Sequence, residues 1–216
     1  MAALVLACPE GLAMSNHYDK FYGYTGMFPI IDDLQAESHK DILREILLAL
    51  PNSKGSLFSR TGLVHGARLF IIDDVIYNGR PSREEHLKYS YLAMSLTFDG
   101  ALDELAERIS ATAADEFGFV FSHCYGFPGA AKAEDVLSYL KACQHETTFL
   151  YVDCDADLPT TLKALAAQPR IADLIDQGQG CSVAERKAFV RELAGLLRNA
   201  STPEPGDFVT SNACVN

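Results

Sequence analysis

Apolar residues between positions 87 and 98 alternate with a period of two, and this pattern constrains the fold more than any other feature of the chain. Successive side chains of a β-strand point to opposite faces of a sheet, so the alternation predicts a strand. One face would carry Ser90, Leu92, Met94, Leu96 and Phe98, and the other Tyr89, Tyr91, Ala93, Ser95 and Thr97. We expect the first, mostly apolar set to face a layer of helices.

Strand and helix patterns follow one another on both sides of this segment. Segments rich in aromatic and β-branched residues predict further strands at 21–31, 67–77 and 117–123. Apolar residues recur at helical spacing in two stripes, which are Ile42, Leu43, Ile46, Leu47 and Leu50, ended by Pro51, and Leu102, Leu105, Ala106 and Ile109. Asp99 is well placed to cap the second of these helices.

The order of these elements predicts the fold class. Strand, helix, strand, strand, helix, strand is the order of the split βαβ unit, so we expect an α+β fold of ferredoxin-like type. This fold is a two-layer sandwich with helices on one face of an antiparallel sheet. Tyr89 and Tyr91 would then stand on the other face, where water solvates aromatic rings poorly. A homodimer that covers this open face is the natural hypothesis.

The last third of the chain predicts additional C-terminal elements. We expect a helix at 133–144, one extra strand at 147–153, a helix with Pro159 at its start, and a Gly-rich break at 178–180. Ser182 and Glu185 fit a capping box at the start of a final helix, whose apolar face would carry Phe189, Leu193, Leu196 and Leu197. The domain organisation is therefore an N-terminal extension at 1–20, one domain at 21–200 and a flexible tail at 201–216.

Composition excludes several classes of protein. A net charge of −11 and a pI near 4.9 would repel a phosphate backbone, so we expect no nucleic-acid partner. No apolar run is long enough for a transmembrane segment. The first thirteen residues lack the basic region of a secretory signal. The six cysteines are irregularly spaced, which favours free thiols and a cytoplasmic location.

Two short constellations at strand ends could carry chemistry. His65 and Arg68 lie three residues apart, so the imidazole could carry a proton while the guanidinium supplies a fixed positive charge for an anionic or peroxidic oxygen. Alternatively, Arg68 pairs with Asp73, Asp74 or Asp99, and His65 is a hydrogen-bonded edge residue. The turn at Asp99-Gly100 could hold an anion on its backbone N–H groups, although capping by Asp99 explains the same residues.

The third constellation is the loop at 122–129, which adjoins the strand expected at 117–123. His123, Cys124 and Tyr125 stand beside two glycines and a proline. His123 or Cys124 could ligate a metal ion or a haem iron, but no CxxC or HxxxH spacing supports a zinc site, and we predict no metal centre. The loop could also be only a tight turn in which Cys124 is a small buried apolar residue.

At these residues the chain resembles a loosely characterised group of bacterial proteins. Their pattern is an HxAR motif on a strand, an FDG turn, and a loop of cysteine, glycine, aromatic residue and proline, and the resemblance spans 22–176. It implies a ferredoxin-like fold of the dimeric α+β-barrel type. Dye-decolourising peroxidases share that fold type, and Asp99-Gly100 is similar to the end of their GxxDG motif. Leu96 stands where that motif has its first glycine.

Two functions remain open on the sequence alone. The chain could be a small-molecule or peroxide-processing enzyme of redox type, and it could bind haem. Its pocket would be surrounded by His65, Arg68, His123 and Tyr125, with Asp99 at the edge. It could instead be a non-catalytic ligand-binding or assembly module that acts through its open sheet face. Fold alone does not choose between them.

Overall fold

An antiparallel sheet forms the centre of the computed structural model, which describes residues 16–32, 38–77, 79–80, 83–147, 149–153, 156–199 and 201–205. Its strands are β1 (His17–Tyr18), β2 (Phe21–Pro29), β3 (Val64–Ile72), β4 (Tyr91–Asp99) and β5 (Gln144–His145). The order is β1-β2-β4-β3, and β5 also pairs with β2. The strands expected at 21–31, 67–77 and 87–98 are therefore confirmed as β2, β3 and β4, with ends that differ by up to five residues.

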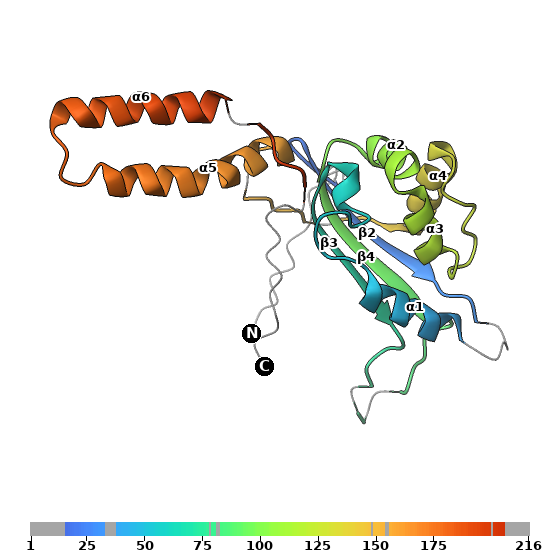
Figure 1. Ribbon diagram of the computed structural model, residues 1–216. Helices are drawn as coiled ribbons and strands as arrows, with labels where there is room; N and C mark the ends of the chain where they lie inside the picture. Colours follow the sequence, from blue (N-terminus) through green and yellow to red (C-terminus); the bar gives the residue numbers. More distant parts are fainter. Residues whose placement is uncertain are drawn as a thin grey trace, which may run out of the picture.

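Four helices cover one face of the sheet (Figure 1). They are α1 (His39–Ala49), α2 (Leu102–Thr112), α3 (Ala114–Phe121) and α4 (Ala133–Cys143). The Tyr24 hydroxyl of β2 donates a hydrogen bond to the carbonyl of Leu140 at 2.9 Å, and the Phe28 ring packs edge-on against Phe121. The apolar set of β4 is buried on this same face, as its alternation predicted. The fold is thus α+β.

The segment expected to form a strand at 117–123 is instead mostly helix α3, so that prediction is wrong. Its aromatic residues fit both periods, because Phe117, Val120 and Phe121 also stand at i, i+3 and i+4. All three are fully buried, whereas Phe119 is 59% exposed. Burial of one helical face against the sheet therefore decided between the two patterns.

The extra strand expected at 147–153 is also misplaced. Residues 147 and 149–153 form no strand, and the side chains of Phe149 and Tyr151 are 82% and 65% exposed. The strand that pairs with β2 comes earlier, at Gln144–His145, directly after α4. The side chain of Leu150 instead lies over Gly23, so this segment covers one end of the open sheet face.

The last two helices form a hairpin that projects away from the sheet (Figure 1). They are α5 (Leu158–Gln177) and α6 (Val183–Asn199), separated by the Gly-rich break that the sequence predicts. The capping box is confirmed, because the Ser182 N–H donates to Glu185 Oε2 at 2.7 Å and the Glu185 N–H donates to Ser182 Oγ at 3.5 Å. The side chains of Leu193, Leu196 and Leu197, and the tail beyond residue 205, lie outside the described residues.

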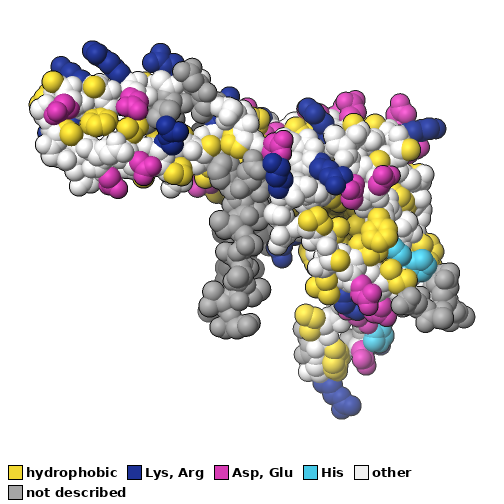
Figure 2. Space-filling model, in the orientation of Figure 1, with side chains coloured by type: hydrophobic (Ala, Val, Ile, Leu, Met, Phe, Trp, Pro, Cys, Tyr) yellow, Lys and Arg dark blue, Asp and Glu magenta, His cyan; other side chains and the backbone are white. Residues whose placement is uncertain are grey.

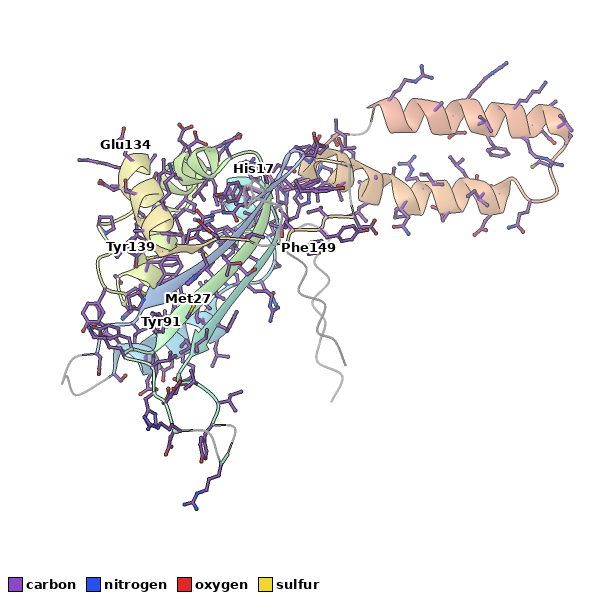
Figure 3. The ribbon with its side chains drawn as sticks, turned by 180° about the vertical axis from the view of Figure 1, so that it is seen from behind. His17, Met27, Tyr91, Glu134, Tyr139 and Phe149 are labelled. Atoms are coloured by element: carbon purple, nitrogen blue, oxygen red, sulfur yellow. The ribbon has the colours of Figure 1, made fainter. Side chains whose placement is uncertain are left out.

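Away from the helices, the sheet presents a face that is only partly covered. Met27, Phe70 and Tyr91 stand there, and Figure 3 marks Met27 and Tyr91 on the sheet. Tyr91 is half-buried and Phe70 is 43% exposed. The prediction that Tyr89 also stands on this face is wrong. The strand β4 begins only at Tyr91, and the Tyr89 ring packs against the ring of Tyr125 with 5.3 Å between their centres.

Two further predictions concern membrane-spanning helices and the cysteines. None of the helices in the described part of the chain is both long and apolar enough to cross a membrane. Cys124, Cys143 and Cys181 are free thiols, while Cys8, Cys154 and Cys214 lie outside the described residues.

Candidate functional site

The predicted site residues separate into two groups at opposite ends of the sheet. Asp99, the partner of His65, pairs in register with Phe21 at one end of β2, whereas the Tyr125 N–H donates to the carbonyl of Pro29 at the other end, at 2.8 Å. A nine-residue strand spans roughly 27 Å at 3.4 Å per residue. The hypothesis that His65 and His123 surround one pocket is therefore wrong.

At the first end, His65 and Asp99 form a close pair. His65 Nε2 lies 2.9 Å from Asp99 Oδ1, and the two side chains are only 18% and 13% exposed. Because a carboxylate can only accept, the Nε2–H of His65 is the donor, and the lone pair of a neutral imidazole is then on Nδ1. A β-bulge between Val64 and Gly66 places His65 outside the regular alternation of β3.

Asp99 also binds the start of α5. Its second oxygen, Oδ2, accepts a hydrogen bond from the backbone N–H of Leu158 at 2.7 Å. The expectation that Asp99 caps α2 is wrong, because the N-cap of α2 is Ala101 and it makes no side-chain cap hydrogen bond. The alternative of an anion bound at the Asp99-Gly100 turn loses one donor, since the Gly100 N–H donates to the carbonyl of Lys20 at 2.8 Å.

A cavity of about 560 Å³ opens beside His65. Its walls come from the end of α1, the connection at 51–59, the first half of β3 and the first turns of α5. Leucines at positions 47, 50, 158 and 162 make much of it apolar, and Ser53, Ser56 and Thr161 supply hydroxyl groups. The volume is in the range of pockets that bind small organic molecules, roughly 300 to 1,000 Å³.

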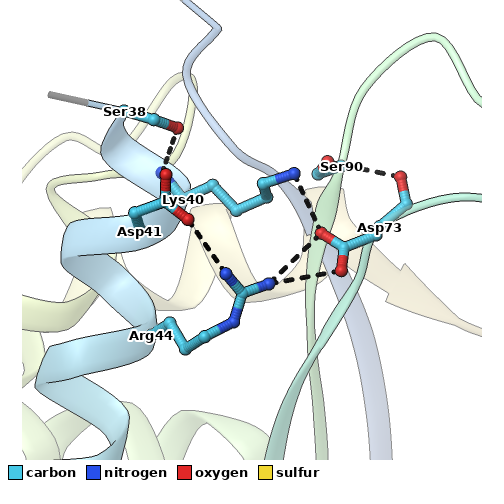
Figure 4. A network of polar contacts seen from close by, with 6 residues as sticks. All are labelled: Ser38, Lys40, Asp41, Arg44, Asp73 and Ser90. Atoms are coloured by element: carbon cyan, nitrogen blue, oxygen red, sulfur yellow. Dashed lines mark hydrogen bonds and ion pairs between the residues drawn. The ribbon is translucent and has the colours of Figure 1, made fainter. Parts of the chain in front are cut away.

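Arg68 does not line this cavity with His65. It pairs in register with Ser95, on the side of the sheet away from the helices, and its guanidinium lies 5.7 Å from the centre of the Phe70 ring. The acidic partners that the sequence offered are occupied by other groups. Asp73 binds Lys40 and Arg44 (Figure 4), Asp74 binds His86, and Asp99 binds His65.

Replacing Arg68 with alanine is expected to change the free energy of unfolding by less than about 1 kcal/mol, because an exposed cation–π contact contributes no more than that. Urea denaturation followed by circular dichroism measures this change. Arg44→Ala, which removes contacts to both Asp41 and Asp73, serves as the comparison. A loss of several kcal/mol in Arg68→Ala would mean that the guanidinium is committed to a structural ion pair.

At the other end of the sheet, His123 faces His39, the first residue of α1. Their Nδ1 atoms lie 2.9 Å apart, so one imidazole must donate a proton to the other. Burial, and then the positive charge that His39 can carry, lower the pKa of His123 below its usual value. His123 is therefore a mainly neutral imidazole at pH 7 that is engaged with a second histidine.

Cys124 and Tyr125 have structural surroundings. Cys124 is 2% exposed, and burial is the main reason that the pKa of its thiol rises to about 12. The backbone N–H of Asp32 donates to the Tyr125 hydroxyl oxygen at 3.3 Å. Positive φ angles at Gly126 and Gly129 confirm that the loop turns tightly where glycine is favoured.

Of the loop residues, Cys124 does not fit a haem site, because a thiol with a pKa near 12 stays protonated at neutral pH and is a poor iron ligand. The Nδ1 of His123 contacts His39, so only the Nε2 of His123 is left for an iron. The neighbouring hollow of about 270 Å³ is lined by residues such as Ile30, Lys88 and Ser90, and not by His123. In the described ranges, no three His, Cys, Asp or Glu side chains lie close enough together to hold a metal ion.

Reasoning from the sequence missed half of the cavity wall. Leu158, Thr161 and Leu162 of α5 lie about ninety residues after His65, and the serines at 53 and 56 precede it in a loop without a recognisable motif. The Asp157 cap and Pro159 do signal where α5 begins. They do not signal that this helix starts against Asp99.

Comparisons of the chain with protein-family models, with curated proteins and with solved structures return no match. The resemblance to the bacterial group therefore stays a prediction, and the function has to be argued from the residues themselves.

Proposed function

We propose that the cavity beside His65 binds a small organic molecule and that His65 transfers a proton to or from it. The observation that supports this proposal most directly is that an imidazole held by a carboxylate stands in the wall of a ligand-sized cavity. Histidine is the side chain whose ordinary pKa suits proton transfer near neutral pH.

Each member of the pair has a distinct role in this proposal. Asp99 accepts the Nε2–H of His65, which fixes the tautomer and orientation of the ring and leaves Nδ1 to meet a ligand. The carboxylate also stabilises the imidazolium that forms when His65 takes up a proton. Asp99 is a positioning residue, because His65 stands between it and the ligand.

The walls of the cavity favour an amphipathic ligand. The leucine side chains would cover an apolar body, while Ser53 and Ser56 offer hydroxyl groups to a polar end. A general acid–base function requires only that the reacting group of the ligand reach His65. Peroxide as a substrate remains a narrower hypothesis, and a chromogenic peroxidase assay tests it separately.

The proposed function is tested by screening small aromatic and aliphatic carbonyl compounds and carboxylic acids with long-range ¹H–¹⁵N NMR of the His65 ring. Compounds that bind are expected to shift the His65 ring signals, and Leu165→Trp should abolish their binding by filling the cavity. Ile175→Trp is the matched control, because it adds the same ring to an exposed position farther along α5. His65→Gln should keep binding but lose any turnover.

Two results would overturn this proposal. One is a screen in which no compound moves the His65 signals. The other is binding that Leu165→Trp leaves intact, since the ligand would then occupy a different place.

The strand order supports a second proposal, on the fold. Read as β5-β2-β4-β3, the sheet places the fourth core strand beside the first and the third beside the second, all antiparallel, which is how the split βαβ unit arranges its strands. We infer a ferredoxin-like variant whose last strand has shrunk to two residues and whose third helix, α3, is an insertion.

An assembly function is the second candidate, and the open sheet face favours it. Met27, Phe70 and Tyr91 stand on this face beyond the part that Leu150 covers. A homodimer that stacks two such faces would remove these side chains from water. The binding site for a small molecule does not depend on this assembly, because the cavity is lined by residues of one chain.

A further inference from the structure

The outer face of α6 combines apolar and basic side chains. Five residues at helical spacing form this stripe, which we call the α6 stripe: Val183, Arg186, Lys187, Val190 and Arg191. A shallow groove of about 390 Å³ runs along it, and its two valines are 68% and 64% exposed. Figure 2 shows Lys and Arg side chains gathered on the side of α6 that faces away from α5.

The charge of α6 is opposite in sign to that of the rest of the molecule. Between Val183 and Asn199 the chain has four basic and two acidic side chains, a net charge of +2. Because the whole chain carries −11, the remaining residues carry −13. Two copies of such a chain repel each other at a distance, and a local patch of positive charge such as the α6 stripe offsets this repulsion where it meets an acidic surface.

Within the described residues, the cations of the stripe bind no carboxylate, in contrast to several cations of the body. Lys40, Arg44 and Arg60 bind acidic side chains of their own chain. Within the described part of the chain, Lys187 and Arg191 form no ion pair, and Arg186 donates its Nε–H to the carbonyl of Cys181 rather than to a carboxylate.

An acidic surface with matching properties lies on α2. Asp103, Glu104 and Glu107 are exposed and stand at i, i+1 and i+4 on the side of α2 that faces away from the core. Arg108 is exposed beside Glu107, so these four side chains carry a net charge of −2. No ion pair engages these three carboxylates among the residues that the structure describes. The α6 stripe cannot reach the α2 of its own chain, because the hairpin projects away from the helices that cover the sheet (Figure 1).

We propose that the α6 stripe docks on the acidic surface of α2 in a second copy of this chain. The three cations meet the three carboxylates, and Val183 and Val190, which line the groove, add apolar contact. Reciprocal docking of the two hairpins closes a dimer, and a contact made in one direction only would extend into longer assemblies.

Charge reversal on each side tests this proposal. The first variant combines Arg186→Glu, Lys187→Glu and Arg191→Glu, and the second combines Asp103→Lys, Glu104→Lys and Glu107→Lys. Light scattering at micromolar concentration is expected to give a wild-type mass of at least twice 23.6 kDa and a mass of 23.6 kDa for each variant alone. An equimolar mixture of the two variants should associate again, because both charge patterns are then exchanged.

Three further measurements separate this contact from others. Reversal of Lys132, Lys141 and Lys163 to glutamate changes the net charge by the same amount as the first variant does and should leave the assembly intact. Raising the salt concentration should dissociate the wild type, since about 0.1 M salt screens exposed charges beyond roughly 10 Å. Tyr91→Lys places a charge on the open sheet face and should have no effect on this contact.

The proposal is overturned by a wild-type mass of 23.6 kDa, by charge-reversed variants that stay associated, or by a mixture that fails to recover. Dissociation by Tyr91→Lys alone, with both charge-reversed variants intact, would assign the interface to the open sheet face instead. Circular dichroism confirms that each variant is folded before its mass is interpreted.

Discussion

The substitution Asp99→Ala is expected to lower the free energy of unfolding by about 2–4 kcal/mol, because two nearly buried N–H donors lose their acceptor at once. Oδ1 of Asp99 binds the Nε2–H of His65, and Oδ2 binds the N–H of Leu158. For a chain of this size, the melting temperature should fall by about 5–10 °C. Urea denaturation and differential scanning calorimetry measure the two quantities.

The substitution Asp99→Ala should also destabilise the start of α5 locally. Hydrogen exchange at Leu158 and in the first turn of α5 should accelerate, because the root of the hairpin is released from β4. Asp173→Ala is the matched control, since it removes a carboxylate that is exposed on α5 and lies in neither the cavity nor the α2 surface. Equal effects of the two variants would show that Asp99 does not hold the hairpin.

The substitution Gly26→Val should destabilise the fold by about 3 kcal/mol, because the added side chain overpacks the core. A Cβ atom on Gly26 would lie 2.7 Å from Cε1 of Tyr24 and 2.9 Å from Cε2 of Phe28. Neither ring can move away easily, because both are buried and the Tyr24 hydroxyl is bonded to the carbonyl of Leu140. The variant should also weaken the pairing of β2 with β5 at Gln144.

Gly66→Val provides the control for this prediction. Gly66 also lies in a strand, but a Cβ atom there meets nothing within 4 Å, so valine should be tolerated and its β-propensity should help slightly. Urea midpoints of the two variants and the wild type decide the comparison. A Gly26→Val midpoint close to that of the wild type would mean that Tyr24 and Phe28 are less constrained than their contacts indicate.

Local patterns in the sequence predicted the elements whose signal has one interpretation. The two-residue alternation of β4 identified its buried face, and the apolar spacing before Pro51 identified α1. The Ser182–Glu185 capping box identified the start of α6, because its hydrogen bonds join residues three apart. Each of these signals depends on neighbours within one turn or one strand.

Other segments had two interpretations, and the sequence could not choose between them. Phe117, Val120 and Phe121 fit a helix as well as a strand. They became α3 because that arrangement buries all three, with Phe121 against Phe28 of β2 and Tyr139 of α4. Phe149 and Tyr151 had strand character, but the edge of β2 was already paired with Gln144–His145.

The candidate site shows the same division. The sequence by itself determined which residues can carry chemistry, namely His65, Asp99, His123 and Cys124, because side-chain type is a local property. Only the tertiary structure decided that His65 meets Asp99 and a cavity, that His123 meets His39, and that Cys124 is buried in the core. These contacts join residues 34 or more positions apart, and the burial of the whole apolar surface selects them.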